Sequence, residues 1–417
     1  MRSPSRIRVA RLALVCVAVA VTVTLTACGT GSSSTADAPA VPSAASAATT
    51  SPAQVAVTGT ATPAPSATGA TTAAAATAGP ALAGFAASSV TFVSTESAFV
   101  LGITACAHAP CTAIAATADR GGKWVALPAP AVPLGDPLAN SGQAAVWGIR
   151  FADQEQGFVF GNGLWVTTDG GERWTATAGP GGSIADLEVI DGQVLALSYA
   201  CSAQSGCGQV GALYRRALSG GAWSFVTRVT GARVIATQAR VATVLDGGSV
   251  VVTGDGGLTF AVRSTPCAGS ASAANAAVAV TGPDSLGLLC AGGAAMGSVQ
   301  KTVYVSDDLG ATWAKAGSPP FAGDPSGISA GTPAQLTVAA VSGASWLYYS
   351  ADGGVQWTIA YRAPIDGGVE FNDLGFTTTA DGVAVLGPVY NDGNSYGMPG
   401  QLLLTSDGGA SWTTVRF

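Results

Sequence analysis

Histidine is almost absent from this sequence, and charged residues are few. Its single histidine, His108, nearly excludes histidine-based catalysis and a multi-histidine metal site, and we expect no metal and no cofactor. Only 10% of the 417 residues are charged, and no basic run occurs. Four of the 18 basic residues lie in the first eleven positions, so the remainder has 14 basic against 24 acidic residues, a net charge of −10. Such a chain is a poor partner for nucleic acid or an anionic membrane surface.

Against this sparse background, one eight-residue pattern recurs along the chain: Ser or Thr, any residue, Asp, any residue, Gly, two further residues, Trp. Five copies are complete, and Thr253–Phe260 has Phe in place of Trp. A seventh copy, Arg216–Trp223, has Leu218 where the Asp is expected. The copies begin at residues 117, 167, 216, 253, 306, 350 and 405, a spacing typical of repeat architectures.

Between the copies, short β-rich runs alternate with turns, most clearly at Val146–Phe151, Gly157–Phe160 and Leu164–Thr168. Four strands per repeat, with this motif, resemble the blades of an Asp-box (bacterial neuraminidase repeat) β-propeller. The resemblance implies an all-β fold, a single seven-bladed β-propeller of four-stranded antiparallel blades. Six blades is the alternative if the Arg216 copy is not a true repeat. We expect the ring to close by packing of blades without strand exchange, unless residues near Leu82–Phe85 add an edge strand.

The motif residues have a mechanical reason. The Asp carboxylate can accept backbone N–H bonds in the turn between the third and fourth strands, and the Gly can adopt a positive φ. The Trp is expected to anchor the fourth strand on the apolar layer of the blade. We therefore interpret the motif aspartates as structural: Asp119, Asp169, Asp255, Asp308, Asp352 and Asp407.

The N-terminus predicts export. Within residues 1–28, four arginines precede an apolar run that ends Leu25-Thr26-Ala27-Cys28-Gly29. This end resembles the lipobox of bacterial lipoproteins, which implies that Cys28 is lipidated; a plain signal peptide or an uncleaved helix are the alternatives. Two acyl chains anchor a protein stably, so we expect the chain at the extracytoplasmic face of the bacterial cell membrane, held by lipid alone. Residues 29–83, almost only Ala, Thr, Ser, Pro and Gly, predict a disordered linker, and residues 84–417 the propeller.

Six further cysteines in an exported chain predict disulfides. Sequence proximity favours Cys106–Cys111, Cys201–Cys207 and Cys267–Cys290. Because strands in a blade alternate in direction, all three pairs fall on the face opposite the Asp-box turns. The long insertions fall on that face too, and binding concentrates on loops of rigid scaffolds. We expect the ligand on this face.

An enzyme is the less favoured interpretation. Sialidases use three arginines, a Tyr nucleophile with a Glu partner and an Asp acid, and carry a Phe/Tyr-Arg-Ile-Pro motif before the first box. Nothing before Thr117 resembles that motif, and Tyr361-Arg362-Ala363-Pro364 matches it only in part. A clamp of Arg150, Arg263 and Arg362 is conceivable. Glutamate occurs only five times, but counting does not exclude a carboxylate pair. We predict no catalytic residues.

The layout Phe151-x-Asp153, Gly157-Phe158 and Gly161 before the second box also resembles the photosystem II assembly factor-like propellers. That resemblance implies a non-catalytic scaffold that docks a protein or peptide on its loop face. A wall polysaccharide is the alternative ligand, and the aromatic and amide side chains of residues 389–396 suit it. The candidate binding residues are Arg150, Arg362, Tyr390, Asn391, Asp392 and Tyr396.

Overall fold

The computed structural model describes residues 82–106, 111–135, 144–202, 206–231, 234–267, 276–363, 369–387, 389–391, 394–396 and 400–417. The predicted leader, lipidation site Cys28 and nearly all of the predicted linker lie outside these residues, as do His108 and Asp392. Within the described ranges, no helix is both long enough and apolar enough to cross a membrane.

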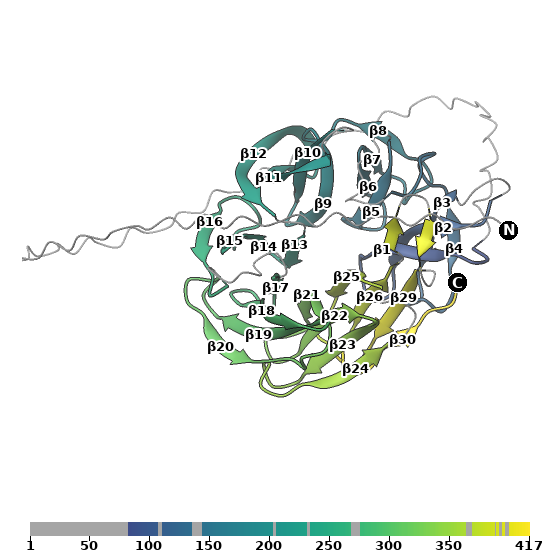
Figure 1. The fold of residues 1–417 in the computed structure, drawn as a ribbon. Coiled ribbons are helices and arrows are strands. Elements are labelled where there is room, and N and C mark those ends of the chain that lie inside the picture. The colour runs from purple at the N-terminus through teal and green to yellow at the C-terminus, as the bar shows by residue number, and fades with distance from the viewer. Residues whose placement is uncertain are drawn as a thin grey trace, which may run out of the picture. The chain divides into compact units, whose positions relative to one another are not determined.

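Seven four-stranded antiparallel sheets follow one another along the chain, which confirms a seven-bladed propeller and shows the six-bladed alternative to be wrong (Figure 1). The first three blades are β1 (Ala86–Phe92), β2 (Ala98–Thr104), β3 (Cys111–Thr117) and β4 (Val125–Leu127); β5 (Val146–Phe151), β6 (Gly157–Gly161), β7 (Leu164–Thr167) and β8 (Thr175–Thr177); β9 (Ser183–Ile190), β10 (Gln193–Ser202), β11 (Gly206–Ala217) and β12 (Gly220–Thr230). The decayed copy at Arg216 thus belongs to a true blade.

The remaining blades continue in the same order. They are β13 (Ile235–Gln238), β14 (Val241–Asp246), β15 (Ser249–Thr253) and β16 (Ala261–Ser264); β17 (Ala277–Val280), β18 (Leu286–Ala295), β19 (Ser298–Ser306) and β20 (Ala314–Gly317); β21 (Asp324–Ala330), β22 (Leu336–Ser342), β23 (Ala344–Ser350) and β24 (Thr358–Arg362); β25 (Phe371–Phe376), β26 (Gly382–Leu386), β29 (Gln401–Thr405) and β30 (Thr413–Thr414). A short hairpin of β27 (Val389–Asn391) and β28 (Asn394–Tyr396) is inserted in the last blade.

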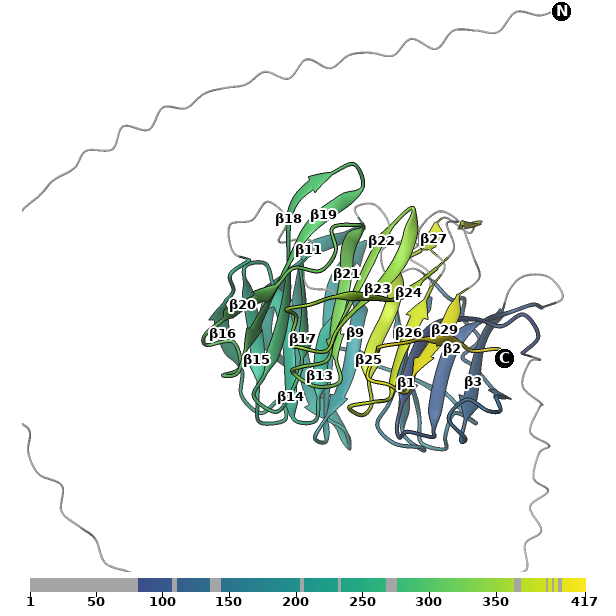
Figure 2. The same cartoon turned by 90° about the horizontal axis from the view of Figure 1, so that it is seen from below.

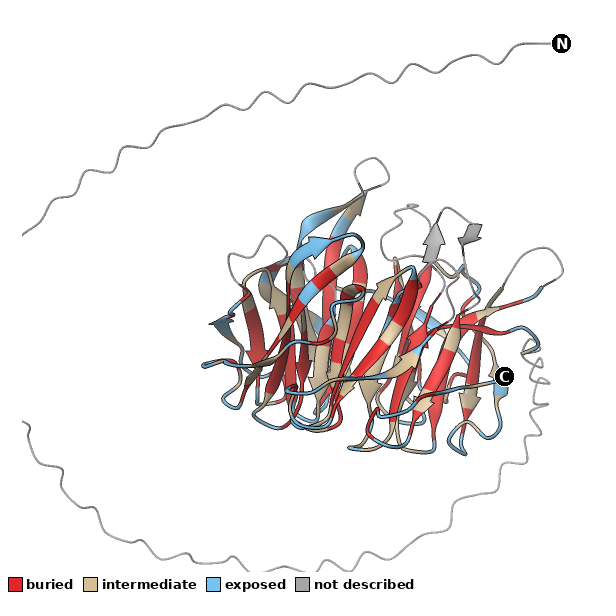
Figure 3. Ribbon diagram, turned by 60° about the horizontal axis from the view of Figure 1, so that its bottom comes forward, coloured by how far each residue is buried: buried red, intermediate tan, exposed pale blue. Residues whose placement is uncertain are grey.

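The first strand of each blade is innermost. Each of these seven strands contacts the first strand of the next blade, and β25 contacts β1, so together they surround the centre of the ring. Apolar side chains of the first three strands fill the space between neighbouring blades, and Figure 3 shows many residues of these strands buried. Phe99 of the first blade stacks on Phe151 of the second with ring centroids 3.6 Å apart. Each blade therefore buries its faces against its two neighbours.

The ring closes by packing of the first and last blades, as expected, with hydrogen bonds across the seam such as that from the Val90 N–H to Asp373 Oδ2. The first and last sheets each consist of strands from one continuous stretch, and no strand is exchanged among the described residues. Phe417 packs against Phe85 and Trp124, at centroid distances of 4.6 and 4.9 Å. The Ala87 N–H donates to the carbonyl of Gly400. The closure is thus an apolar seam with few hydrogen bonds.

The repeated turns share one geometry. In the last turn, Asp407 Oδ1 accepts the Thr405 hydroxyl at 2.7 Å and the Ser411 N–H at 2.9 Å. In the fifth blade, hydrogen bonds from the hydroxyl and N–H of Thr312 lower the pKa of Asp308 to about 2. The Gly at the fifth position has a positive φ in all six turns that carry the Asp, for example 99° at Gly409. These carboxylates are occupied in holding turns.

The motif tryptophans do more than anchor their own strand. Three of them donate an indole N–H to a backbone carbonyl at or just after the end of the preceding blade's last strand. The pairs are Trp174 to Pro128, Trp223 to Ala178 and Trp313 to Ser264. The indoles of Trp357 and Trp412 bond within their own turns. In three blades the motif therefore links neighbouring blades as well.

Candidate functional site

Alternating strand direction gives the ring two distinct faces. We call loop face the one with the connections between second and third strands and between blades, and turn face the one with the repeated turns. The loop face carries the predicted disulfides: Cys106–Cys111 and Cys201–Cys207 at the β2–β3 and β10–β11 connections, and Cys267–Cys290 between the β16–β17 connection and β18. All three predicted pairings are confirmed.

One projection on the loop face is the joined end of β18 and β19, residues 291–300, which we call the arm. Figure 2 shows it extending past the neighbouring blades. Residues 292–297 are Gly, Gly, Ala, Ala, Met and Gly, and Met296 is fully exposed. No charged side chain lies in this tip. The tip is exposed (Figure 3), and its uncharged, mostly small residues and Met296 face solvent.

The arm is braced on both sides at its base. On one side, the Cys267–Cys290 disulfide ties β18 to the preceding connection. On the other, the buried Lys301 Nζ donates to the carbonyls of Val299, Phe321, Ala322 and Gly323 at 2.6–3.0 Å. Burial lowers the pKa of Lys301 to about 8, against the opposing effect of Asp324. The two braces fix the direction of the arm.

A cluster of charged side chains lies at the centre of the ring, on the innermost strands. Arg150 of β5 reaches Glu188 (Nε–Oε1, 2.6 Å) and Asp186 (Nη2–Oδ1, 3.6 Å) of β9, and Asp373 of β25 (Nη2–Oδ1, 3.1 Å). Its Nη1 also donates to Ser89 Oγ of β1 at 3.1 Å. We call these four charged residues the Arg150 cluster. Together with Ser89, the cluster joins four blades through one guanidinium group.

The cluster holds three carboxylates against one cation, and its members lie largely out of water. Burial raises the pKa of Asp186 to about 8, although Arg150 opposes the shift, and burial likewise raises the pKa of Glu188. Burial alone would lower the pKa of Arg150, but the three carboxylates together raise it well above its usual value. The guanidinium is therefore permanently charged, and burial makes Asp186 and Glu188 easier to protonate than exposed carboxyl groups.

The structure does not gather the predicted binding residues into one site. Arg150 is engaged at the centre of the ring, whereas Arg362 is exposed on the outermost strand β24. Arg263 lies on β16, which is also an outermost strand. The three arginines of the conceivable clamp therefore belong to three different blades, with Arg150 on an innermost strand and Arg263 and Arg362 on outermost strands. The backbones of Tyr390, Asn391 and Tyr396 form the β27–β28 hairpin of the last blade. Their roles in binding stay predictions.

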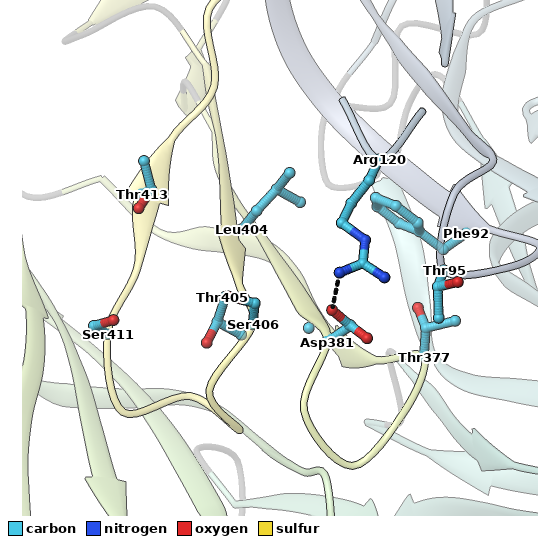
Figure 4. A pocket seen from close by; sticks show the side chains of 11 residues that line it. Phe92, Thr95, Arg120, Thr377, Asp381, Leu404, Thr405, Ser406, Ser411 and Thr413 are labelled. Carbon is cyan, nitrogen blue, oxygen red and sulfur yellow. Dashed lines mark ion pairs between the residues drawn. The ribbon is translucent and has the colours of Figure 1, made fainter. Parts of the chain in front are cut away.

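The turn face has a cleft of about 210 Å³ at the seam between the first and last blades. Arg120 of the first turn reaches over it and pairs with Asp381 of the β25–β26 connection (Nη1–Oδ1, 3.4 Å; Figure 4). The other lining residues come from the same two blades and are Phe92, Thr95, Thr377, Gly382, Leu404, Thr405, Ser406, Ser411 and Thr413. The cleft combines one cation, one anion, several hydroxyl groups and two apolar side chains.

Arg120 has a left-handed backbone, with φ = 61°. Its position in the turn requires a positive φ, and four of the six turns that carry the Asp place Gly there: Gly170, Gly256, Gly353 and Gly408. A non-glycine residue in this region costs about 1–2 kcal/mol. The Arg120–Asp381 pair is half-exposed and contributes about 0–1 kcal/mol. The ion pair therefore does not offset the backbone cost.

Neither the partners of Arg150 nor the seam cleft was predicted from the sequence. Charged residues inside otherwise apolar first strands, such as Asp186 and Glu188 within Ser183–Ile190, were a readable signal of a buried charge cluster. Aligning the repeated turns would also have singled out Arg120, because it replaces Gly where Gly is favoured. Among the described residues, no group of three or more His, Cys, Asp or Glu side chains is arranged to hold a metal ion.

The chain matches no protein-family model and no curated protein sequence. Solved structures do share its fold. One is YCF48 bound to D1 peptide, 18% identical over 78% of this chain and 93% of that chain, with a TM-score of 0.50. Another is YCF48 from Cyanidioschyzon merolae, 14% identical over 79% and 98%, with a TM-score of 0.51. A GH74 xyloglucanase from Xanthomonas campestris is 14% identical over 79% and 72%, with a TM-score of only 0.30. At these identities the likeness concerns the fold alone.

Proposed function

We propose that this protein is a non-catalytic scaffold that binds a protein or peptide partner on its loop face. The observation that carries the proposal is the braced arm. A disulfide and a buried lysine hold this hairpin in place, and the side chain of Met296 at its tip is fully exposed to solvent. Holding an element rigid before binding lowers the entropy lost on association. A fixed, uncharged tip suits an apolar site on a folded partner or an extended chain.

The rest of the loop face supports the same interpretation. Two further disulfides stiffen the connections at β2–β3 and β10–β11, and the β27–β28 hairpin adds a second projection. The fold likeness to YCF48 bound to D1 peptide supports a peptide as the class of partner. The Arg150 cluster favours a binding role over a hydrolytic one, because its carboxylates are largely buried and engaged by Arg150 and backbone N–H groups.

The location is part of the proposal. A lipid on Cys28 and the Ala/Thr/Ser/Pro-rich residues 29–83 would hold the propeller outside the cell membrane at the end of a long tether. If the tether behaves as a flexible coil, its ends lie ~40 Å apart on average. The partner would then be another extracytoplasmic protein within that reach.

Photo-crosslinking in intact cells tests the proposal. A photoreactive residue is placed at Met296 in the arm, at Tyr396 in the β27–β28 hairpin and, as a control, at Glu172. Glu172 is exposed in a repeated turn on the opposite face. We expect a discrete protein adduct from Met296 or Tyr396 and none from Glu172. Adducts from neither loop-face position, or equally from all three, would reject the scaffold on this face.

A further inference from the structure

Arg120 is not explained by the stability of the fold. Among the turns that carry the Asp, only Arg120 and Leu309 are non-glycine residues at the left-handed position. Leu309 packs on buried side chains of its own and the preceding blade, Val241, Val252 and Leu286, which accounts for its presence. Arg120 has an exposed side chain whose one interaction with described residues is the single ion pair to Asp381. Strain kept without a matching gain in stability is typical of functional positions.

The seam cleft has a definite chemistry. One cation and one anion give it no net charge, which does not favour a charged ligand. Six hydroxyl groups line it. Those of Thr405 and Ser411 donate to Asp407, whereas those of Thr95, Thr377, Ser406 and Thr413 make no hydrogen bond to another described side chain or carbonyl. Phe92 and Leu404 add an apolar surface (Figure 4). A ligand here would meet donors, acceptors and an apolar patch at once.

We propose that the seam cleft binds one residue of a neutral sugar. A sugar ring presents hydroxyl groups that both donate and accept, and an apolar face of C–H groups. Arg120 would donate to ligand oxygens, Asp381 would accept from ligand hydroxyls, and the Ser and Thr side chains can do both. Phe92 and Leu404 would lie against the C–H groups. A zwitterion such as a free amino acid would have to compete with the existing Arg120–Asp381 pair.

This site is distinct from the docking surface proposed above, because it lies on the turn face. Its position also predicts a second effect. The lining residues belong to the first and last blades alone, so a bound sugar would contact both sides of the seam. A ligand that binds the folded protein and not the unfolded chain raises apparent stability in proportion to its saturation of the site. Binding should therefore raise the melting temperature.

The test uses the full-length chain and four neutral disaccharides, maltose, cellobiose, lactose and N,N′-diacetylchitobiose, in saturation-transfer NMR and thermal melts. We expect at least one to bind weakly and to raise the melting temperature. Arg120→Gly should weaken that binding about tenfold or more, as loss of a charged hydrogen bond does. Without sugar, its melting temperature should equal or exceed that of the wild type. Asp381→Asn should weaken binding as well.

Leu309→Gly is the matched control. It relieves the same backbone strain at the same turn position but lies away from the cleft, so it should bind like the wild type while losing stability through its lost packing. The proposal is overturned if none of the disaccharides binds, or if the free amino acid glycine binds instead of them. It is also overturned if Arg120→Gly retains the full affinity for the sugar. A clearly lower melting temperature of Arg120→Gly without ligand would also overturn it, because Arg120 would then be structural.

Discussion

At the scale of single residues, the buried Arg150 and its three carboxylate partners depend on pairing to compensate for lost hydration. A guanidinium and three carboxylates, taken largely out of water, lose hydration that only close pairing returns. Arg150 pairs with Glu188, Asp186 and Asp373, and donates further to Ser89. Asp186 in turn accepts the N–H groups of Leu187 and Ile235. Such a cluster contributes less to net stability than its contacts suggest, but removing one member is costly.

Arg150→Met should therefore destabilise the fold by about 3–5 kcal/mol at neutral pH, because it leaves three buried carboxyl groups close together without the cation that pairs with them. The loss should be smaller at pH 5, where those carboxylates can take up protons. Urea unfolding at pH 5 and pH 7.5 measures both values. The exposed Arg362→Met should change neither. An Arg150→Met variant as stable as the wild type at both pH values would show that the Arg150 cluster does not stabilise the fold.

The pH dependence of the wild type follows from the same residues. The folded-state pKa of Asp186 is raised to about 8, so the folded protein holds this proton more tightly than the unfolded chain. The free energy of unfolding should then fall as pH rises from about 4 to about 8.

The turn carboxylates act oppositely: Asp308, with its pKa lowered to about 2, contributes stability that is lost as pH falls below about 4. Asp186→Asn should flatten the fall above pH 4 in a pH series of urea unfolding curves and leave the acid limb unchanged.

The role of a single residue could be predicted from the sequence only where its partners lie close to it along the chain. Asp407 accepts from Thr405 and Ser411, so its role was visible within one motif. Cys201 and Cys207 are likewise close in sequence. Arg150, by contrast, meets Asp373 across 223 positions of sequence, and the choice among possible carboxylates is made only when the ring closes. Local patterns carry no record of that choice.

At the scale of elements, the motif tryptophan joins blades. Trp174 packs edge-on against Phe151, with centroids 6.0 Å apart, and its indole donates to Pro128 of the preceding blade at 3.0 Å. The periodic motif predicted a blade, but it could not predict this bond, because the acceptor is a backbone carbonyl that no residue type marks. The link depends on how neighbouring blades sit against one another.

Trp174→Ala should cost about 3–4 kcal/mol, since it removes a large ring from a packed interface together with its hydrogen bond. Trp174→Phe keeps an aromatic ring and loses the N–H, so it should cost about 1 kcal/mol. Thermal and urea unfolding distinguish the two. Equal losses for both variants would mean that the hydrogen bond, and not the packing, accounts for the effect.

The arm depends on Lys301 in a comparable way. Lys301→Met preserves much of the side-chain volume but removes the donor to four backbone carbonyls. Leaving buried acceptors unpaired should cost about 1–3 kcal/mol. Amide hydrogen exchange should increase in residues 298–302 and 321–324 and stay unchanged in the first blade. The exposed Lys315→Met on β20 is the matched control. Uniform loss of protection across all blades would show that Lys301 supports the whole ring and not the arm.

At the scale of the whole molecule, the seven blades form a ring whose ends meet without a shared strand. The first strand of every blade contacts that of the next, so each blade is held from two sides, and the seam depends on side-chain packing around Phe85, Trp124 and Phe417. The number of blades was predictable from the motif count. The cleft at the seam was not, because Arg120 and Asp381 become neighbours only through closure.

Closure makes a prediction that concerns the entire ring. Phe417→Ala removes a partly buried aromatic side chain from the seam and should cost about 2 kcal/mol, less than a fully buried phenylalanine. Because no hydrogen-bonded strand pairing crosses the seam, the damage should remain there. Hydrogen exchange should rise in β1, β4 and β30 before it rises in the third to fifth blades. Phe225→Ala, an exposed aromatic on β12, should leave every blade unchanged. If Phe417→Ala instead raises exchange equally in all seven blades, the ring unfolds as one cooperative unit and the seam is not its weakest point.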